Sequence, residues 1–261
     1  MSLSLIITTY NRPDALLLVL RSIMRQTQFP NEIIIADDGS DNFTKKCIDN
    51  FQKSSSIKLI HSWHPDEGFR VAMCRNKAIV KASSDYIVMI DGDMILHSKF
   101  IEDHVKHAEP GFFVQGSRSL LKKDVTKKAL ADSNIDFSFF SKGLNNRKNA
   151  LHSFWLNKIF SKKMIHLGSV RTCNMGFYKQ DSININGFNN DIKGWGREDS
   201  EFASRLLNNG IYCKVVRFNL LQFHLWHQNS SRLNVLKNDA ILQICIDQKL
   251  KWCESGLNKY L

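Results

Sequence analysis

Short apolar runs alternate with longer amphipathic segments over the first hundred residues. Four of the runs place apolar residues at consecutive positions, which is typical of strands that are buried on both faces. They predict strands at 3–10, 31–40, 57–63 and 86–90, and the segments between them predict helices at 13–27, 43–53 and 69–82. This order predicts an α/β fold in which a mostly parallel central sheet is flanked by helices and connected by right-handed crossovers.

Polar side chains stand where these strands end. Thr9 and Tyr10 close the first strand, Asp38 follows in the second, and Asp91 and Asp93 come directly after the fourth. In open parallel sheets, ligands bind beyond the carboxyl ends of the strands. We therefore expect these side chains to converge on one binding site at that edge of the sheet.

The periodic pattern loosens after residue 100. It predicts a mixed helical segment at 119–165, a strand at 211–218 and a closing helix near 233–254. A Gly-Trp-Gly turn at 194–196 precedes the acidic start of a further helix. A chain of 261 residues is long enough to bury a substantial core, and we expect a single domain.

The formal net charge of +11 favours an anionic partner: nucleic acid, an acidic lipid surface or a phosphorylated ligand. Lysines are dense between 118 and 163, either as a solvated face or as a patch that docks on a membrane surface or an acceptor. The chain carries no recognised nucleic-acid-binding motif and no GxGxxG after its first strand. We therefore expect neither a nucleic-acid partner nor a nicotinamide cofactor.

The cysteines and the apolar runs bear on the compartment. The six cysteines are scattered without a CxxC pair, and the N-terminal residues show no secretory signal, so we expect reduced thiols. The longest apolar run, at 15–20, is far shorter than the ~20 residues that a membrane span needs. These features predict a cytoplasmic protein, with peripheral contact at the inner face of the cell membrane if the lysine-rich segment docks there.

Two separate motifs offer ligands for a divalent cation. Asp91 and Asp93 flank one glycine at a strand end, and such carboxylates suit Mg²⁺ or Mn²⁺ unless they cap the following turn or bind backbone amides. His224 and His227 lie close together in "HLWH", and imidazole combined with carboxylate favours Mn²⁺ over Mg²⁺. A histidine pair also occurs in purely structural roles, so each motif alone leaves both possibilities open.

Adjacent carboxylates follow the Gly-Trp-Gly turn. One of Glu198 and Asp199 is a candidate to bind a substrate hydroxyl and the other to remove its proton, while Trp195 offers an apolar face for a sugar ring. The alternative is an acidic helix start that interacts favourably with the helix dipole.

Seven motifs occur together along the chain: "IITTYNRP", "ADDGS", "DEGFRVAMCRNKAI", "MIDGDM", "CNMGF", "GWGREDSEF" and "HLWH". In this order they resemble the nucleotide-sugar glycosyltransferases of the GT-A (Rossmann-like) fold, in particular family 2. The C-terminal half is similar to β-1,4-galactosyltransferases and chondroitin-polymerase-type enzymes. The likeness leaves only about 119–165 and the final helix unmatched. Ser200 stands where the animal galactosyltransferases carry a third consecutive acid, which leaves the acceptor open.

The resemblance implies a role for each motif residue. The residues that would bind the nucleotide-sugar are Thr9, Tyr10, Asp38, Arg75, Asn76, Asp91 and Asn174. The residues that would hold Mn²⁺ or Mg²⁺ are Asp93, His224 and His227. Asp199 would be the general base, and Glu198 and Trp195 would contact the sugar or the acceptor.

The resemblance also implies an architecture and an activity. Residues 1–100 would be the nucleotide-sugar-binding half and 101–232 the acceptor and catalytic half of one GT-A domain, with a helical insertion at 119–165 and a C-terminal helix at 233–261. The activity would be inverting, metal-dependent transfer of a hexose or N-acetylhexosamine from a UDP-sugar, with galactose or N-acetylgalactosamine favoured. The acceptor would be a saccharide or lipid-linked saccharide in bacterial surface polysaccharide or lipooligosaccharide synthesis. A catalytically silent sugar-binding relative and a basic nucleic-acid-binding protein are the alternatives, and the oligomeric state is not assigned.

Overall fold

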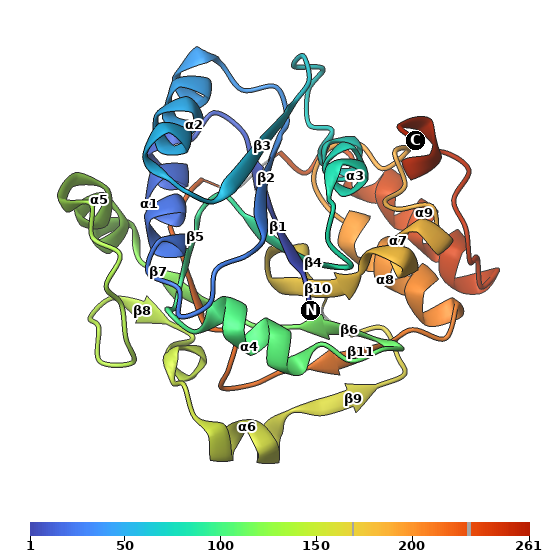
Figure 1. Cartoon of the computed structure of the whole chain (residues 1–261). Coiled ribbons are helices and arrows are strands. Elements are labelled where there is room, and N and C mark those ends of the chain that lie inside the picture. The colour runs from blue at the N-terminus through green and yellow to red at the C-terminus, as the bar shows by residue number, and fades with distance from the viewer. Residues whose placement is uncertain (169, 229–230) are drawn as a thin grey trace.

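The computed structural model describes residues 1–168, 170–228 and 231–261, and it confirms the α/β prediction. Its main sheet has eight strands in the order β3-β2-β1-β4-β10-β6-β11-β9 (Figure 1). The N-terminal four are β1 (Leu3–Thr9), β2 (Glu32–Asp37), β3 (Lys58–Trp63) and β4 (Tyr86–Asp91). They pair in parallel, so their carboxyl ends meet at one edge of the sheet.

Helices cover both faces of these parallel strands. α1 (Pro13–Ile23) and α2 (Asn42–Ser54) pack on one face, and α3 (Val71–Lys81) packs on the other. Ile7 of β1 belongs to the core beneath α1, whereas its neighbour Ile6 belongs to the core beneath α3. Because successive side chains of a strand point to opposite faces, covering both faces requires the consecutive apolar positions seen in the sequence.

Two of the predicted elements end earlier than the apolar pattern suggests. β2 ends at Asp37 because the chain turns there: Asp37 Oδ1 accepts a hydrogen bond of 2.8 Å from the backbone N–H of Ser40. Gly39 takes a φ of +93° in this turn, a conformation that favours glycine. α1 ends at Ile23 because the N–H of Met24 bonds to carbonyls both three and four residues back, which tightens and closes the last turn.

The second half of the main sheet is mixed in direction. Its strands are β6 (Phe112–Gln115), β9 (Lys162–Met164), β10 (Met175–Tyr178) and β11 (Tyr212–Val215). β10 runs antiparallel to both β4 and β6, and β11 runs parallel to β6 and antiparallel to β9. The parallel prediction therefore holds for the first half of the sheet.

The segment 119–165, predicted as a mixed helical insertion, contains strands as well as helices. It contains β7 (Ser119–Leu121), α5 (Lys123–Asp132), β8 (Leu144–Asn145), the 3₁₀ helix η1 (Arg147–Ala150), α6 (Phe154–Phe160) and β9. Strands of two or three residues carry too little alternation to be recognised in a sequence, and pairing with distant strands decides their structure.

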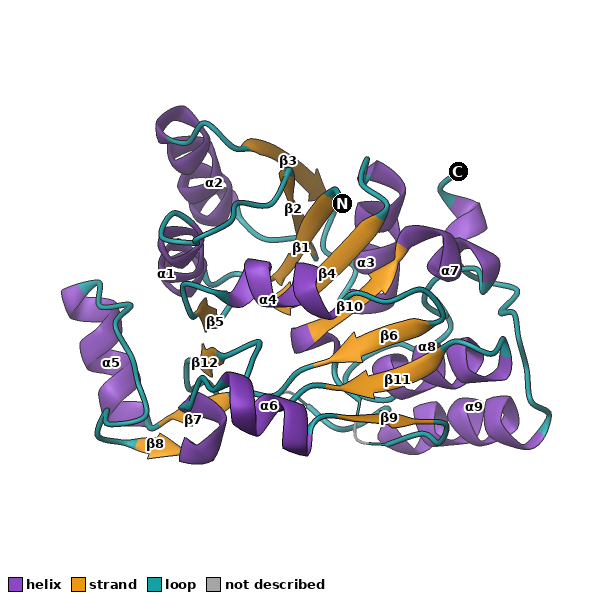
Figure 2. Cartoon of the chain, turned by 60° about the horizontal axis from the view of Figure 1, so that its bottom comes forward, coloured by secondary structure: helices purple, strands orange, loops and turns teal. Residues whose placement is uncertain are grey.

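A second, smaller sheet joins this segment to two distant parts of the chain. Its order is β5-β12-β7-β8, with β5 (Met94–Leu96) directly after the Asp-Gly-Asp turn and β12 (Gln222–His224) leading into the histidine pair (Figure 2). His224 lies opposite Met94 in the antiparallel pairing of these two strands. The small sheet thus brings together motifs that are far apart in the sequence.

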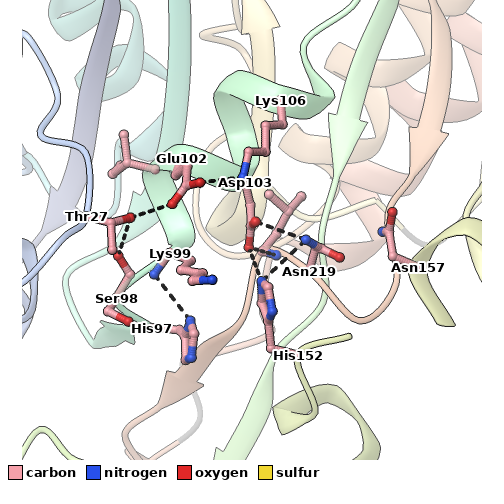
Figure 3. A network of polar contacts seen from close by, with 12 residues as sticks. Thr27, His97, Ser98, Lys99, Glu102, Asp103, Lys106, His152, Asn157 and Asn219 are labelled. Carbon is pink, nitrogen blue, oxygen red and sulfur yellow. Dashed lines mark hydrogen bonds and ion pairs between the residues drawn. The ribbon is translucent and has the colours of Figure 1, made fainter. Parts of the chain in front are cut away.

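A buried carboxylate on α4 (Phe100–His107) anchors the region around η1 (Figure 3). Asp103 is 1% exposed, and its Oδ2 lies 2.9 Å from His152 Nε2 while its Oδ1 accepts a 2.9 Å hydrogen bond from Asn219 Nδ2. Burial opposes the charge of Asp103, but the contacts with His152 and Asn219 outweigh it and lower the pKa of this carboxyl. The ring of His152 also stacks on that of His97.

The C-terminal region completes the helical layer beside β10 and β11. Its elements are the 3₁₀ helix η2 (Thr172–Asn174), α7 (Lys179–Asn184), α8 (Glu198–Asn208), α9 (Val235–Asp247) and the 3₁₀ helix η3 (Leu257–Lys259). α9 packs against α8 and is shorter than the predicted closing helix, because Lys249 takes a φ of +49°. All six cysteines are free thiols. Over the described ranges, none of the helices has the length and apolar character needed to cross a bilayer.

Candidate active site

Asp93, His224 and His227 form a cluster at the edge where β1 and β4 end. Asp93 Oδ2 lies 3.4 Å from His224 Nε2, 3.3 Å from His227 Nε2 and 3.1 Å from Arg12 Nη1. The backbone supports this arrangement, because the N–H of Leu225 donates a 2.9 Å hydrogen bond to the carbonyl of Asp93. The structure therefore brings together the two motifs that the sequence offers as cation ligands.

The chemistry of this cluster suits a divalent cation. One carboxylate and two imidazoles present ligand atoms that all lie within 4.8 Å of one another, a donor set that fits Mn²⁺. Asp93 Oδ1 is buried without a hydrogen-bond partner in the described chain. Although burial alone would raise the pKa of Asp93, the hydrogen bond from His224 and the charges of His224, His227 and Arg12 lower it. The carboxylate is thus kept ionised and has a free oxygen.

A buried arginine connects the aspartate of β4 to the two acids of α8. Arg75, on α3, is 4% exposed. Its Nη1 lies 3.0 Å from Asp199 Oδ1 and 3.3 Å from Glu198 Oε1, and its Nη2 lies 3.6 Å from Asp91 Oδ1. Burial raises the pKa of Asp91, with Arg75 acting in the opposite direction. The guanidinium thus offsets the mutual repulsion of three neighbouring carboxylates.

Asp199 is held in one orientation by three donors. The backbone N–H of Thr172 donates to its Oδ2 at 3.1 Å, and the Thr172 hydroxyl donates to its Oδ1 at 2.8 Å, beside the contact with Arg75. The turn before α8 makes this placement possible, because Gly194, Gly196 and Arg197 all take positive φ values. Asp199 then lies in the first turn of the helix, where the helix dipole favours a negative charge.

Glu198 and Trp195 flank this carboxylate. Burial, with a further contribution from Asp199, raises the pKa of Glu198 to about 7, and its Oε2 is buried without a partner in the described chain. Trp195 is 42% exposed, and the Arg232 guanidinium lies 5.2 Å from the centroid of its ring. A carboxyl group with a pKa near neutrality can donate a hydrogen bond to a sugar hydroxyl when it is protonated and accept one from the hydroxyl when it is ionised.

The other predicted nucleotide residues lie at the ends of β1 and β2. Asp38 Oδ2 accepts a 2.9 Å hydrogen bond from the N–H of Arg70, and its Oδ1 lies 3.1 Å from His64 Nε2. Burial raises the pKa of Asp38 to about 6. Thr9 Oγ1 is buried without a partner in the part of the chain described, and the hydroxyl of the half-exposed Tyr10 donates to Asp66 at 2.8 Å.

Two predicted donor-binding amides are engaged by the protein itself. Asn76 is fully buried and bonds in both directions with the backbone of Phe188, donating to its carbonyl and accepting from its N–H, each at 2.7 Å. Asn174 Nδ2 donates to the carbonyls of Ser117 and Leu220, both at 2.8 Å, and its Oδ1 lies 3.1 Å from His104 Nε2. Both side chains thus hold the backbone in place, and their contact with the donor stays a prediction.

The structure adds residues that sequence reasoning did not single out. Arg12 contacts Asp93, Thr172 orients Asp199, and Arg118 Nη1 lies 3.1 Å from Cys173 Sγ. Arg12 lies within the motif "IITTYNRP" and Thr172 directly precedes "CNMGF", so their closeness to these motifs could have pointed to them. Arg118 follows β6 in a segment without any such signal.

Bacterial relatives align with most of this chain. They include a hyaluronan synthase from Pasteurella multocida (25% identity over 241 residues), a chondroitin synthase from Escherichia coli (24% over 234 residues) and a validoxylamine A glucosyltransferase from Streptomyces hygroscopicus subsp. limoneus (26% over 243 residues). Each alignment covers 82% of this chain but only 24%, 33% and 50% of the respective relative. The chain thus spans between a quarter and a half of the length of these proteins.

Solved structures share its fold. S. aureus TarS 1-349 in complex with UDP has a TM-score of 0.62 at 16% identity, covering 94% of this chain and 65% of that one. The mannosyltransferase PcManGT from Pyrobaculum calidifontis, in complex with GDP-Man and Mn²⁺, has a TM-score of 0.60 at 14% identity, covering 95% of this chain and 71% of that one. The GT-A fold expected from the motifs is confirmed.

Family models match both halves of the chain. The model for the N-terminal domain of galactosyltransferase matches residues 158–228, which contain the acids of α8 and the histidine pair. The model for glycosyl transferase family 2 matches residues 4–168, which is more than half of the chain. With the GT-A fold and the convergence of carboxylates and histidines at its strand ends, the protein belongs to glycosyltransferase family 2.

Proposed function

We propose that the protein is an inverting, metal-dependent glycosyltransferase that moves a hexose or N-acetylhexosamine, with galactose or N-acetylgalactosamine favoured, from a UDP-sugar to a saccharide acceptor. The observation that carries this proposal is the juxtaposition of a cation-binding cluster with a separately oriented carboxylate. Asp93 and the two histidines make the first, and Asp199 makes the second. Asp91 and Arg75 lie between them.

The cluster and the base divide the work of the reaction. Asp93, His224 and His227 would hold the divalent cation, and that cation would supply positive charge to the departing diphosphate. Asp199 takes the proton of the acceptor hydroxyl as its oxygen bonds to the anomeric carbon, while the bond from that carbon to the UDP oxygen breaks. Attack from the face opposite UDP converts an α-linked donor into a β-linked product.

The contacts around Asp199 support its role as the base. Thr172 and Arg75 hold the carboxylate of Asp199 in one orientation. Little conformational entropy is therefore lost when this carboxylate accepts the acceptor proton. Glu198 would hold a sugar hydroxyl, and the exposed face of Trp195 would lie against a sugar ring.

At the other end of the site, Thr9, Tyr10 and Asp38 would hold the nucleoside. The unpartnered Oγ1 of Thr9 and the partly exposed Tyr10 ring suit this role. Structures of S. aureus TarS in complex with UDP and UDP-GlcNAc, which share the fold, support a UDP-sugar as donor. The bacterial polysaccharide synthases among the relatives support an acceptor in surface polysaccharide or lipooligosaccharide synthesis.

We further propose that the enzyme works in the cytoplasm and docks on the inner face of the membrane through α6. Phe154, Trp155, Ile159 and Phe160 of this short helix are 60%, 72%, 71% and 55% exposed. The Lys158 ammonium lies 4.7 Å from the centroid of the Phe154 ring, so a cation accompanies the aromatic side chains. Exposed aromatic residues beside lysines suit the interface of an anionic bilayer, where rings enter the headgroup region and ammonium groups meet phosphates.

A donor panel tests the activity. Purified protein is incubated with Mn²⁺ and single UDP-sugars, UDP release is measured with and without saccharide acceptors, and the product is examined by NMR. We expect Mn²⁺-dependent transfer with a β-anomeric proton in the product. An α-linked product would contradict the inverting mechanism, and binding of UDP-sugars without turnover would indicate the silent sugar-binding alternative.

A further inference from the structure

A cavity of about 380 Å³ lies beside the base, and its charged lining residues are all cationic. They are Arg118, Lys162, Arg171 and Arg217, which we call the basic pocket. We propose that the basic pocket binds an oxyanion, a carboxylate or a phosphate, carried by the acceptor saccharide. This inference rests on the proposed function, because it names the class of molecule that the transferase accepts. The volume falls within the range of small-ligand sites.

The pocket is built by elements that meet only in the folded chain. β9 contributes Lys162, and Arg217 follows β11, which pairs with β9. Arg118 lies between β6 and β7, and Arg171 precedes η2. Neighbouring cations repel one another, and although water screens the exposed Lys162, Arg171 and Arg217, a bound anion would relieve this repulsion.

The four cations of the pocket form no ion pairs with the described residues. None of the pocket's described lining residues is an acid. The contrast on the same strand is informative. Lys163 is the immediate neighbour of Lys162, and its Nζ forms an ion pair of 2.6 Å with Glu109 on the other side of β9. Lys163, which points away from the cavity, is therefore neutralised by an acid, whereas Lys162, which lines the cavity, has no such partner among the described residues.

The pocket adjoins the position where the acceptor must react. Thr172, which donates twice to Asp199, stands between Arg171 and Cys173 of the pocket wall. Arg118 contacts Cys173 from within the pocket at 3.1 Å. A saccharide whose anionic group sits among these cations would therefore be bound next to the segment that orients Asp199.

The donor diphosphate has a separate place. The candidate cation ligands Asp93, His224 and His227 are not among the pocket-lining residues, and neither are Thr9 and Asp38. Arg118 lies near enough to the donor site to interact with the charges of Asp91 and Asp93. We therefore assign to the second substrate an anion that the other three cations of the basic pocket hold. Surface polysaccharides and lipid-linked saccharides provide such groups as uronic acid carboxylates or as sugar phosphates, and the two sources share the same chemistry at the guanidinium groups.

Binding measurements with paired probes test the inference. The probes are 4-nitrophenyl β-D-glucuronide, glucose 6-phosphate and the neutral 4-nitrophenyl β-D-glucoside, titrated by calorimetry into protein with UDP and Mn²⁺. We expect at least one anionic probe to bind about tenfold more tightly than the neutral one, and the tighter of the two identifies carboxylate or phosphate as the source. Lys162→Ala and Arg217→Ala should each weaken the anionic probe several-fold and leave UDP binding unchanged.

The matched control is Lys163→Ala, which removes the same charge from the adjacent position on the opposite face of β9. Equal binding of neutral and anionic probes, no binding of either anionic probe at millimolar concentration, or an equal loss in Lys162→Ala and Lys163→Ala would overturn the inference. UDP affinity and UDP-sugar turnover are measured on the same samples. Their failure would refute the proposed function, whereas selective failure of the anionic probes refutes the pocket alone.

Discussion

Replacing Arg75 by methionine should destabilise the protein strongly, and more so as the pH rises. The guanidinium is 4% exposed and lies between three carboxylates, with 3.0 Å to Asp199 and 3.3 Å to Glu198. Methionine fills much of the same volume without charge or donors. The substitution therefore leaves buried negative charges facing one another, and it also removes the contacts that orient Asp199.

The magnitude follows from burial and from the partners. Removing one member of a buried ion pair costs about 3–5 kcal/mol, because the remaining charge is left without compensation. Burial already raises the pKa of Glu198 to about 7 and raises that of Asp91. A carboxyl whose folded-state pKa exceeds its unfolded value leaves stability intact at low pH and reduces it as the pH rises through that interval. Without Arg75 the gap between the folded and unfolded pKa values of these carboxyls widens, so the loss of unfolding free energy should be near its maximum at pH 8. Near pH 5 it should fall to about 1–2 kcal/mol, which reflects only the missing hydrogen bonds of Arg75.

Urea unfolding followed by tryptophan fluorescence measures this effect, since the free energy of unfolding extrapolates linearly with denaturant. Lys81→Met places the same new side chain at an exposed position of the same helix and should change stability by less than about 0.5 kcal/mol. A deficit below about 1 kcal/mol for Arg75→Met at pH 8, or a deficit that does not shrink toward pH 5, would refute the view that this arginine neutralises the three acids.

The remaining predictions concern single side chains. Asp199→Asn should lower kcat by about 10²–10⁴ and leave the Kd for UDP unchanged, which single-turnover kinetics and calorimetry would separate. The pH profile of kcat/KM should have a transition near pH 7, because burial raises the pKa of Glu198 to about 7, and Glu198→Gln should remove that transition. Mn²⁺ at 100 times its Kd should stabilise the wild-type protein by about 2.7 kcal/mol, and His227→Ala should reduce the corresponding rise in Tm. Trp155→Ser should weaken co-sedimentation with phosphatidylglycerol vesicles about tenfold, while Phe43→Ser, an equally exposed aromatic on α2 at the far end of the molecule (Figure 1), should not.

The sequence predicted strands correctly where the strand itself contains a run of consecutive apolar residues. β1, β2, β3 and β4 are visible as apolar runs because helices bury both of their faces. The small sheet gave no such signal. β12 pairs with β5 and β7 over two or three residues, and no local periodicity records a partner more than a hundred positions away. The meeting of Asp93 with His224 was accessible only through the resemblance, since β12 is the element that brings the two together.

Local pattern also missed the short strands of the segment 119–165, for a related reason. Its lysines and apolar residues suggest helices, and α5 and α6 are indeed present. The three short strands of the segment exist because other strands offer edges on which they can pair: β7 pairs with β12, β8 with β7, and β9 with β11. One of those strands, β9, forms a wall of the basic pocket, so the part of the chain with the weakest pattern supplies the most distinctive surface of the site.

Whether a buried polar atom has a hydrogen-bond partner helps to distinguish residues that could contact a ligand from residues that hold the backbone. A buried donor or acceptor without a partner costs about 1–3 kcal/mol, so such an atom at the edge where a ligand would bind is a candidate contact for that ligand. Thr9 Oγ1, Asp93 Oδ1 and Glu198 Oε2 are buried without partners in the described chain, and all three lie along the edge where the strands end. Asn76 and Asn174 come from equally specific motifs, yet each gives its amide to backbone groups. A sequence motif does not distinguish the two kinds of residue, because displacing a residue that holds the backbone would disturb the site as much as losing a ligand contact, and only the coordinates show which atoms have no partner.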